Sequence, residues 1–307
     1  MFRKRRLALA AAVVVLITAL ATAVGGGGNA PRNKSDAATP VDSAVFVPSA
    51  CMSYPPTKGD RHLTVFLDAG HGGLDPGSVG TTQSGKTIYE ADLTLPVELN
   101  AMALLRAKGF TVVVSRTKNT SVATLKPDDV DGKLLTAQGV HDDVAARAVC
   151  ANDAHANILI GIYFDAGAKN NAGSVTGYDA VRSFASKNLR LATLVQDDVL
   201  TAMNRRGWGI PDEGVQTDGE LGSSLNSDAV SYGHLLLIGP ADPGFFSTPS
   251  QMPGALIEPL FITDPFESSI ADSKTGQEVI AGGIALAAEQ YFGPATSKQA
   301  VGKKHTT

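Results

Sequence analysis

The chain has 307 residues, of which 43% are hydrophobic and 18% charged, a composition typical of a globular protein with a buried core. Four of its 26 basic residues lie among the first six, so the remainder carries 22 basic against 30 acidic residues, a net charge of −8. There is no basic run with interleaved aromatic residues, which excludes nucleic-acid binding as an expected function.

The N-terminus predicts export. Residues 3–6 are all basic, residues 7–24 form an uncharged apolar run, and small residues and four glycines follow. This order is that of a secretory signal peptide, and the run is also close to the minimum length of a membrane-spanning helix. We therefore predict that residues 1–24 are either a cleaved signal peptide or a retained membrane anchor. In both cases the rest of the chain is extracellular, in the cell wall or held at the outer side of the cytoplasmic membrane.

The remaining chain divides by composition into a linker, one domain and a tail. Residues 25–60 are rich in Gly, Pro, Ser, Asn and Ala, which is typical of a flexible linker. Residues 61–292 have an even composition that fits one domain, and the polar residues 293–307 are expected to be disordered. The two cysteines, Cys51 and Cys150, are expected to form a disulfide in an exported protein; the alternative is two unpaired thiols.

Short apolar runs alternate with segments of helical periodicity along the domain. Strands are expected at residues 63–69, 110–116, 158–166, 174–181, 234–240 and 253–262. Helices are expected at residues 95–109, 142–157, 188–207 and 277–292. In the first helix, apolar residues at steps of three or four predict the buried face: Leu95, Leu99, Met102 and Leu105.

Strands of near-continuous Val, Ile and Leu, separated by helices, predict the fold class. We expect a single α/β domain with a central, mostly parallel sheet and helices on both faces. In such sheets the functional loops follow the carboxyl ends of the strands.

Three side chains at or near strand ends could meet in one site. His71 follows the first strand in VFLDAGHGG and is surrounded by glycines, which permit positive φ and close approach of a ligand. The loop lacks both phosphate-binding patterns, GxGxxG and GK[ST]. Glu90 lies just before the next helix, and Glu258 lies within the apolar run GALIEPLFI, where a carboxylate is rare unless it is paired or binds a metal.

These segments resemble a known enzyme family. LDAGHGGLDPGSVG, the glutamate of IYEADL, VVVSRT, ARAVCAN and ALIEPLF are similar, in this order, to the zinc-dependent N-acetylmuramoyl-L-alanine amidases. The resemblance extends from about residue 63 to residue 292. It implies a single α/β domain, Zn²⁺ as the cofactor, and peptidoglycan or a muropeptide as the substrate. The expected reaction is hydrolysis of the amide between N-acetylmuramic acid and L-alanine.

The resemblance also assigns the site. It implies that His71 and Glu90 are zinc ligands and that Glu258 is the catalytic glutamate. The family's third ligand is a histidine in a strand-end motif such as SIHAD, and the corresponding position here holds Tyr163. A catalytic zinc ion takes three protein ligands and one water, so another group has to complete the site. The alternatives are Asp165, on the same face of the strand, the phenolate of Tyr163, or His234.

The departure at Tyr163 leaves three hypotheses of function, the third being that a different metal or a non-hydrolytic role has replaced zinc-dependent hydrolysis. In the first, the zinc site is complete and the protein is a cell-wall amidase. In the second, the metal is weakly bound or absent, and the protein is a catalytically impaired relative that binds or regulates the cell wall.

Overall fold

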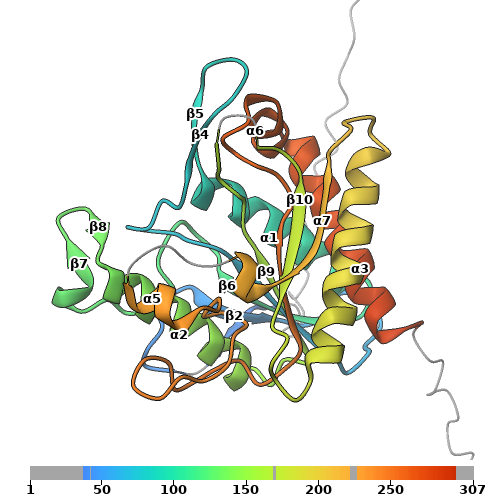
Figure 1. Cartoon of the computed structure of the whole chain (residues 1–307). Helices are drawn as coiled ribbons and strands as arrows, with labels where there is room; N and C mark the ends of the chain where they lie inside the picture. The colour runs from blue at the N-terminus through green and yellow to red at the C-terminus, as the bar shows by residue number, and fades with distance from the viewer. Residues whose placement is uncertain (1–36, 42, 169–170, 222–226, 295–307) are drawn as a thin grey trace, which may run out of the picture. The chain divides into compact units, whose positions relative to one another are not determined.

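The computed structural model describes residues 37–41, 43–168, 171–221 and 227–294, and Figure 1 shows their arrangement around a central sheet. The strands of this sheet are β1 (Thr39–Pro40), β2 (Ala50–Tyr54), β3 (Thr64–Ala69), β6 (Thr111–Arg116), β9 (Ile158–Ile162), β10 (Ser174–Tyr178), β11 (Asp212–Thr217) and β12 (Gly254–Glu258). Two small hairpins are formed by β4 (Val79–Thr81) with β5 (Thr87–Tyr89) and by β7 (Val130–Asp131) with β8 (Leu134–Leu135).

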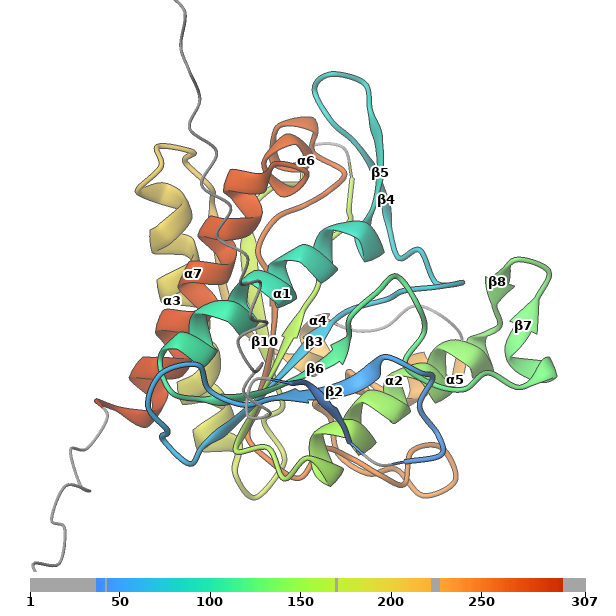
Figure 2. The ribbon, with the colours of Figure 1, turned by 180° about the vertical axis from the view of Figure 1, so that it is seen from behind.

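Helices cover both faces of the sheet. They are α1 (Glu90–Ala107), α2 (Ala137–Asp153), α3 (Ala185–Asn204), α4 (Asp218–Leu221), α5 (Ser227–Tyr232), α6 (Pro265–Ala271) and α7 (Lys274–Phe292), with a 3-10 turn at Pro127–Asp129. Figures 1 and 2 show α1, α3 and α7 together on one side and α2 on the other. Strand residues alternate between these two layers: Val65 and Leu67 pack with the first group, whereas Phe66 packs with α2. The predicted α/β domain with a mostly parallel, doubly covered sheet is confirmed.

The order of the strands brings the predicted site together at one edge. The sheet runs β1-β2-β6-β3-β9-β12-β10-β11, and β6, β3, β9 and β12 are parallel to one another. Their carboxyl ends therefore lie along the same edge, and His71, Tyr163 and Glu258 lie at or just beyond the ends of three adjacent strands. Strand β10 runs antiparallel to β12, so its carboxyl end lies at the opposite edge.

The first helix buries a different face from the predicted one. Helix α1 begins at Glu90 and continues through Pro96, and its buried apolar residues are spaced by four: Leu93, Val97, Ala101 and Leu105. Only Leu105 belongs to the predicted set. The helix also begins five residues before the predicted start, directly after β5.

The strand predicted at residues 234–240 is wrong. This segment forms turns after α5, and its residues Leu237 and Ile238 pack onto the sheet face that also holds Phe66 and Leu256. The apolar run is explained by burial over the sheet rather than by pairing within it. Conversely, β11 was not predicted, because its sequence DEGVQT has few apolar residues and lies at the edge of the sheet.

The expected linker at residues 25–60 is also partly wrong. Strand β2 lies inside this range and pairs with β6, and Ala50 and Cys51 are buried. The ordered fold therefore includes residues well before 61. The signal peptide or anchor predicted at residues 1–24 and nearly all of the tail predicted at 293–307 lie outside the described residues. None of the helices in the described part of the chain has the length and apolar character needed to cross a bilayer.

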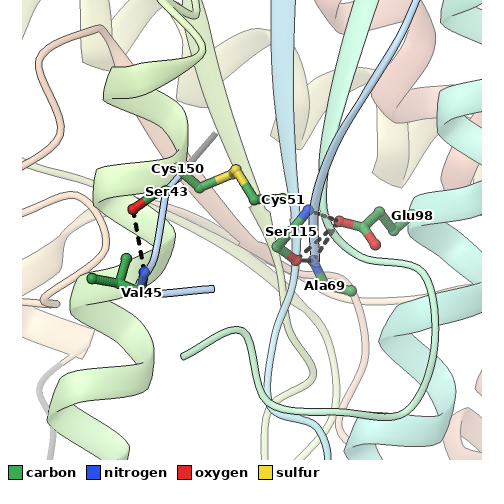
Figure 3. The surroundings of a disulfide bond; sticks show 7 residues. All are labelled: Ser43, Val45, Cys51, Ala69, Glu98, Ser115 and Cys150. Carbon is green, nitrogen blue, oxygen red and sulfur yellow. Dashed lines mark hydrogen bonds between the residues drawn. A yellow bond between two sulfur atoms is a disulfide. The ribbon is translucent and has the colours of Figure 1, made fainter. Parts of the chain in front are cut away.

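Cys51 and Cys150 form a disulfide that joins β2 to α2, as Figure 3 shows. Both cysteines are fully buried, and 99 positions separate them in the sequence. A crosslink that closes so long a loop restricts the unfolded chain strongly. The bond thus holds the edge of the sheet, which is otherwise formed by a short segment of turn-rich composition, against the body of the domain.

We expect the double substitution Cys51→Ala with Cys150→Ala to lower the free energy of unfolding by about 2–5 kcal/mol. Equilibrium unfolding in urea under oxidising conditions measures the change. Wild-type protein with the bond reduced serves as the control, because it loses the crosslink but keeps both side chains. A loss below about 1 kcal/mol in the double variant would contradict a stabilising role for this bond.

Candidate active site

The loop after β3 holds His71 in a backbone conformation that few residues adopt. His71 has φ of 61°, in the left-handed region, and Gly72, Gly73 and Gly77 also have positive φ. A Cβ at Gly77 would lie 2.8 Å from both Glu90 Oε2 and His71 Cδ2. Glycine at this position is therefore needed for the loop to close over the two side chains.

Two buried arginines hold the backbone beneath His71. Arg147 of α2 donates hydrogen bonds to the carbonyl oxygens of Ala69 and His71, each at 2.7 Å, and forms ion pairs with Asp68 and Asp143. Arg116, at the end of β6, donates to the carbonyl oxygens of Ala69, Gly70 and Ala91. These contacts explain how a glycine-rich loop keeps one conformation. Both arginines support the fold beneath the site.

Glu90 meets His71 where the β4–β5 hairpin enters helix α1. Its Oε1 lies 3.1 Å from His71 Nε2 and accepts a hydrogen bond from the Phe164 amide at 2.9 Å. Its Oε2 accepts a hydrogen bond from the Ser78 amide at 2.9 Å. Glu90 is buried, and these bonds fix the orientation of its carboxylate. Two of the predicted site residues are thus in direct contact, although 19 residues separate them in the sequence.

The imidazole of His71 is held between two carboxylates. Its Nδ1 lies 2.8 Å from Asp75 Oδ2, on the side opposite to Glu90. Burial alone would lower the pKa of His71, but the charges and hydrogen bonds of Glu90 and Asp75 outweigh this effect and raise the pKa to about 10. The surroundings of His71 therefore favour a positive charge.

Glu258 lies at the carboxyl end of β12, close to this pair. Burial raises its pKa to about 8, and the nearby charges of Asp165 and Glu90 act in the same direction. The carboxyl of Asp165, just beyond β9, also has a raised pKa because of burial and the charge of Glu90. Asp165 is held by a backbone bridge to Phe261, in the loop that follows Glu258. The structure thus brings His71, Glu90, Glu258 and Asp165 to one region at the edge of the sheet.

Tyr163, just after β9, contacts Asp68 and His71. Its hydroxyl donates a hydrogen bond to Asp68 Oδ2 at 3.1 Å, and its ring packs edge-on against the His71 imidazole with centroids 5.3 Å apart. Gly70 makes room for the ring, since a Cβ there would lie 2.5 Å from it. Burial and the charge of Asp68 raise the pKa of Tyr163 well above its usual value. Tyr163 is therefore a neutral phenol, which disfavours a phenolate ligand at this position.

His234 is not brought to His71. It lies against Asp179 and Asp218, with its Nδ1 3.1 Å from both carboxylate oxygens of Asp218. Within the described part of the chain, these three residues are the one group whose potential ligand atoms all lie within 4.8 Å of one another. His71, Glu90 and Asp165 do not form so tight a group.

Comparison with known families identifies the family of this chain. The family model described as N-acetylmuramoyl-L-alanine amidase (Amidase_3) matches residues 65–290, which include His71, Glu90 and Glu258.

The chain belongs to this amidase family.

Individual relatives of the chain are distant in sequence. It is 25% identical to the germination-specific N-acetylmuramoyl-L-alanine amidase of Bacillus subtilis (strain 168) over 232 residues, 74% of this chain and 79% of the relative. Among solved structures, an N-acetylmuramoyl-L-alanine amidase from Clostridium difficile 630 aligns with a TM-score of 0.51 and 26% identity, covering 75% of this chain and 96% of that one. The CwlD amidase of Clostridioides difficile, solved in complex with the GerS lipoprotein, shares the fold with a TM-score of 0.55 at 21% identity over 75% and 98% of the chains.

Sequence reasoning missed two acidic residues that support the candidate site. Asp75, which contacts His71, belongs to the DPG segment of the motif, but it was not predicted as a partner. Its position four residues after the histidine, across a turn that contains Gly72 and Gly73, was the available signal. The other is Glu98 in α1, whose Oε1 accepts hydrogen bonds from the amides of Ala69 and Ser115 and from the Ser115 hydroxyl (Figure 3). Glu98 thus joins β3 to β6 directly below the His71 loop.

We expect the stability of the protein to depend on the ionisation of Glu98. Burial raises its pKa from 4.5 to about 8, against the opposing charge of Arg116. Between these two values the folded state binds a proton that the unfolded state has lost, so the free energy of unfolding falls as the pH rises from about 5 to about 8. Glu98→Gln cannot ionise and removes this contribution.

Urea unfolding of the wild type and of Glu98→Gln at several pH values from 5 to 8 measures this contribution. Between pH 5 and pH 8, the free energy of unfolding of the wild type should fall relative to that of Glu98→Gln by about 3–5 kcal/mol. Any constant cost of placing an amide at this position cancels in the comparison. A difference that stays the same at every pH would contradict a buried neutral Glu98.

Proposed function

We propose that the protein is an exported, zinc-dependent amidase that hydrolyses the amide between N-acetylmuramic acid and the L-alanine of peptidoglycan or of muropeptides. One observation carries the proposal: in a member of this family, His71, Glu90 and Glu258 meet at the carboxyl edge of the sheet. The basic and apolar segment at residues 1–24 supports export, and peptidoglycan lies outside the membrane.

The residues at this edge fit a zinc ion in their chemistry. Imidazole nitrogen and carboxylate oxygen are accepted zinc ligands, and His71 Nε2 and Glu90 Oε1 already lie 3.1 Å apart. The hydrogen bond from His71 Nδ1 to Asp75 is of the kind that orients metal-binding histidines. The raised pKa of His71 reflects surroundings that attract a positive charge, which a bound metal would supply in place of the proton.

We propose Asp165 as the third ligand. Its carboxylate lies near both Glu90 and Glu258. Tyr163 is engaged by Asp68, and His234 lies with two other carboxylates. In this arrangement Tyr163 packs against the edge of His71 and helps to orient the imidazole without binding the metal.

Glu258 is the residue that would transfer protons during the hydrolysis. A zinc ion held by His71, Glu90 and Asp165 would lower the pKa of a water molecule to about 7 and would polarise the scissile carbonyl. Glu258 would accept a proton from that water and pass it to the leaving amine of L-alanine. The pKa of Glu258, about 8, lies near neutrality because the carboxyl is buried beside other acids. A group with such a pKa can both accept and donate a proton at physiological pH.

A second candidate function follows from Tyr163. The family histidine is missing there, and the proposed ligand atoms of His71, Glu90 and Asp165 do not lie within 4.8 Å of one another among the described residues. This observation favours a relative that binds the cell wall without hydrolysing it. The two candidates differ in a measurable property, since only the amidase requires a metal at Glu90.

Release of peptide from purified peptidoglycan, together with the zinc content of the whole chain, tests the proposal. We expect the wild type to be active with zinc and inactive after chelation, and Glu90→Gln to lose both activity and the zinc bound at this site. Asp92→Asn is the matched control, because Asp92 lies two residues along the same helix but is exposed. Activity in Glu90→Gln equal to that of Asp92→Asn would overturn the proposal. A wild type that binds peptidoglycan but releases no peptide in the presence of zinc would favour the second candidate.

A further inference from the structure

A second cluster of potential ligands lies away from the amidase site. It consists of Asp179, which follows β10, Asp218, at the start of α4 after β11, and His234, which follows α5. The Nδ1 atom of His234 lies 3.1 Å from each carboxylate oxygen of Asp218 and 3.8 Å from Asp179 Oδ2. Three segments that are separate in the sequence thus converge on one point.

The cluster contains an oxygen atom with no partner. Asp179 is fully buried, and while its Oδ1 accepts a hydrogen bond from the Arg182 amide, its Oδ2 has no hydrogen-bond partner among the described residues. Asp218 is 1% exposed. An unpaired carboxylate oxygen in the interior is costly, and this one faces His234. A positive ligand between the three side chains would give this oxygen a partner.

The cluster is distinct from the site at the other end of the sheet. Val175, near the start of β10, pairs with Glu258, and Asp179 lies four residues further along the chain, just after the strand ends. At about 3.3 Å per residue, this separation is about 13 Å. Because β10 and β12 are antiparallel, the two groups lie near opposite edges of the sheet. A single ion cannot be shared between them.

We propose that Asp179, Asp218 and His234 bind a divalent transition-metal ion, of which zinc is the expected one. The separations of 3.1 and 3.8 Å between His234 Nδ1 and the carboxylate oxygens bracket the roughly 3.3 Å expected between two ligands of a tetrahedral zinc ion. Calcium and magnesium prefer oxygen ligands throughout, whereas imidazole with carboxylates suits zinc and its neighbours. Two buried carboxylates also supply the negative charge that such an ion would balance.

A bound ion would stabilise the segments that supply its ligands. It would join the ends of β10 and β11 to residue 234, where the chain turns back over the sheet and packs Leu237 and Ile238 onto it. The Leu235 amide already donates a hydrogen bond to Asp218 Oδ2, which orients that carboxylate. The metal would thus hold the start of the segment that covers this face. The alternative is that His234 forms ion pairs with Asp179 and Asp218 and that no metal binds.

Zinc titration of the whole chain in competition with a chromophoric chelator tests the inference, with Ca²⁺ as the probe expected not to bind. We expect His234→Gln and Asp179→Asn each to remove one equivalent of zinc, or to weaken its binding at least about tenfold. Glu90→Gln should leave this equivalent unchanged and remove the other. His155→Gln, an exposed histidine, is the matched control.

The outcomes separate this site from the amidase site. One equivalent in the wild type, lost in His234→Gln but kept in Glu90→Gln, would support the inference even if the proposed amidase site fails to bind zinc. Zinc binding that is the same in His234→Gln as in His155→Gln would overturn it, and so would tighter binding of Ca²⁺ than of zinc. His234 is partly exposed, so His234→Gln is expected to fold if Asp179→Asn does not, and circular dichroism verifies this.

Discussion

Glu258→Gln should lower the rate of peptide release from peptidoglycan by about 10²- to 10⁴-fold while zinc stays bound. The substitution keeps the size of the side chain but removes its ability to accept a proton from water and deliver it to the leaving amine. Glu258 lies at the end of β12 with a pKa near 8, and it is not among the proposed metal ligands. The rate with a soluble muropeptide, measured at saturating zinc, gives the effect directly.

Glu278→Gln is the control for this experiment. Glu278 lies on the surface of α7, where it pairs with the exposed Lys274, so its loss should leave the rate unchanged. If Glu258→Gln and Glu278→Gln have equal rates, Glu258 takes no part in the reaction. If Glu258→Gln instead loses its zinc, Glu258 is a ligand, and the proposed roles of Glu258 and Asp165 have to be exchanged.

The largest effect on stability is expected from Arg147→Leu, which should lower the free energy of unfolding by about 3–5 kcal/mol. Arg147 is fully buried and pairs with Asp68 and Asp143, each at 2.7 Å. Its removal leaves both carboxylates without their partner in the interior. It also frees the carbonyl oxygens of Ala69 and His71, to which the guanidinium donates hydrogen bonds.

Urea denaturation of Arg147→Leu at neutral pH measures this cost. Arg206→Leu makes the same chemical change at an exposed position after α3 and should cost less than about 0.5 kcal/mol. Equal stabilities of the two variants would show that the buried ion pairs do not hold the loop beneath His71. The activity of Arg147→Leu should fall as well, because the backbone that presents His71 loses its support.

The site residues that could be predicted from the sequence lie at or near the ends of predicted strands. Runs such as VFLDA and ALIE indicate buried parallel strands, and parallel strands bring their carboxyl ends to one edge. The pattern of apolar runs therefore indicates that His71 and Glu258 lie at the same edge of the sheet. Glu90 could be added because it precedes a helix that packs against the same strands.

The parts that could not be predicted depend on packing between segments that look alike in the sequence. The run HLLLIGP has the composition of a strand, and only the sheet face it covers shows that it forms turns. Strand β11 is polar and owes its place to pairing with β10. The partner of His234 could not be identified either, since Asp179 and Asp218 come from two different strand ends, one of them in a strand that was not predicted.

We propose that this edge of the sheet hydrolyses one particular amide bond. Mass spectrometry of peptidoglycan digested by the zinc-loaded chain tests it most directly, by identifying the new ends of the products. We predict stem peptides that begin with a free L-alanine amine and glycan strands whose N-acetylmuramic acid carries no peptide, both absent with Glu258→Gln. Cleavage at any other bond, or no cleavage by a chain that holds zinc at Glu90, would contradict the claim.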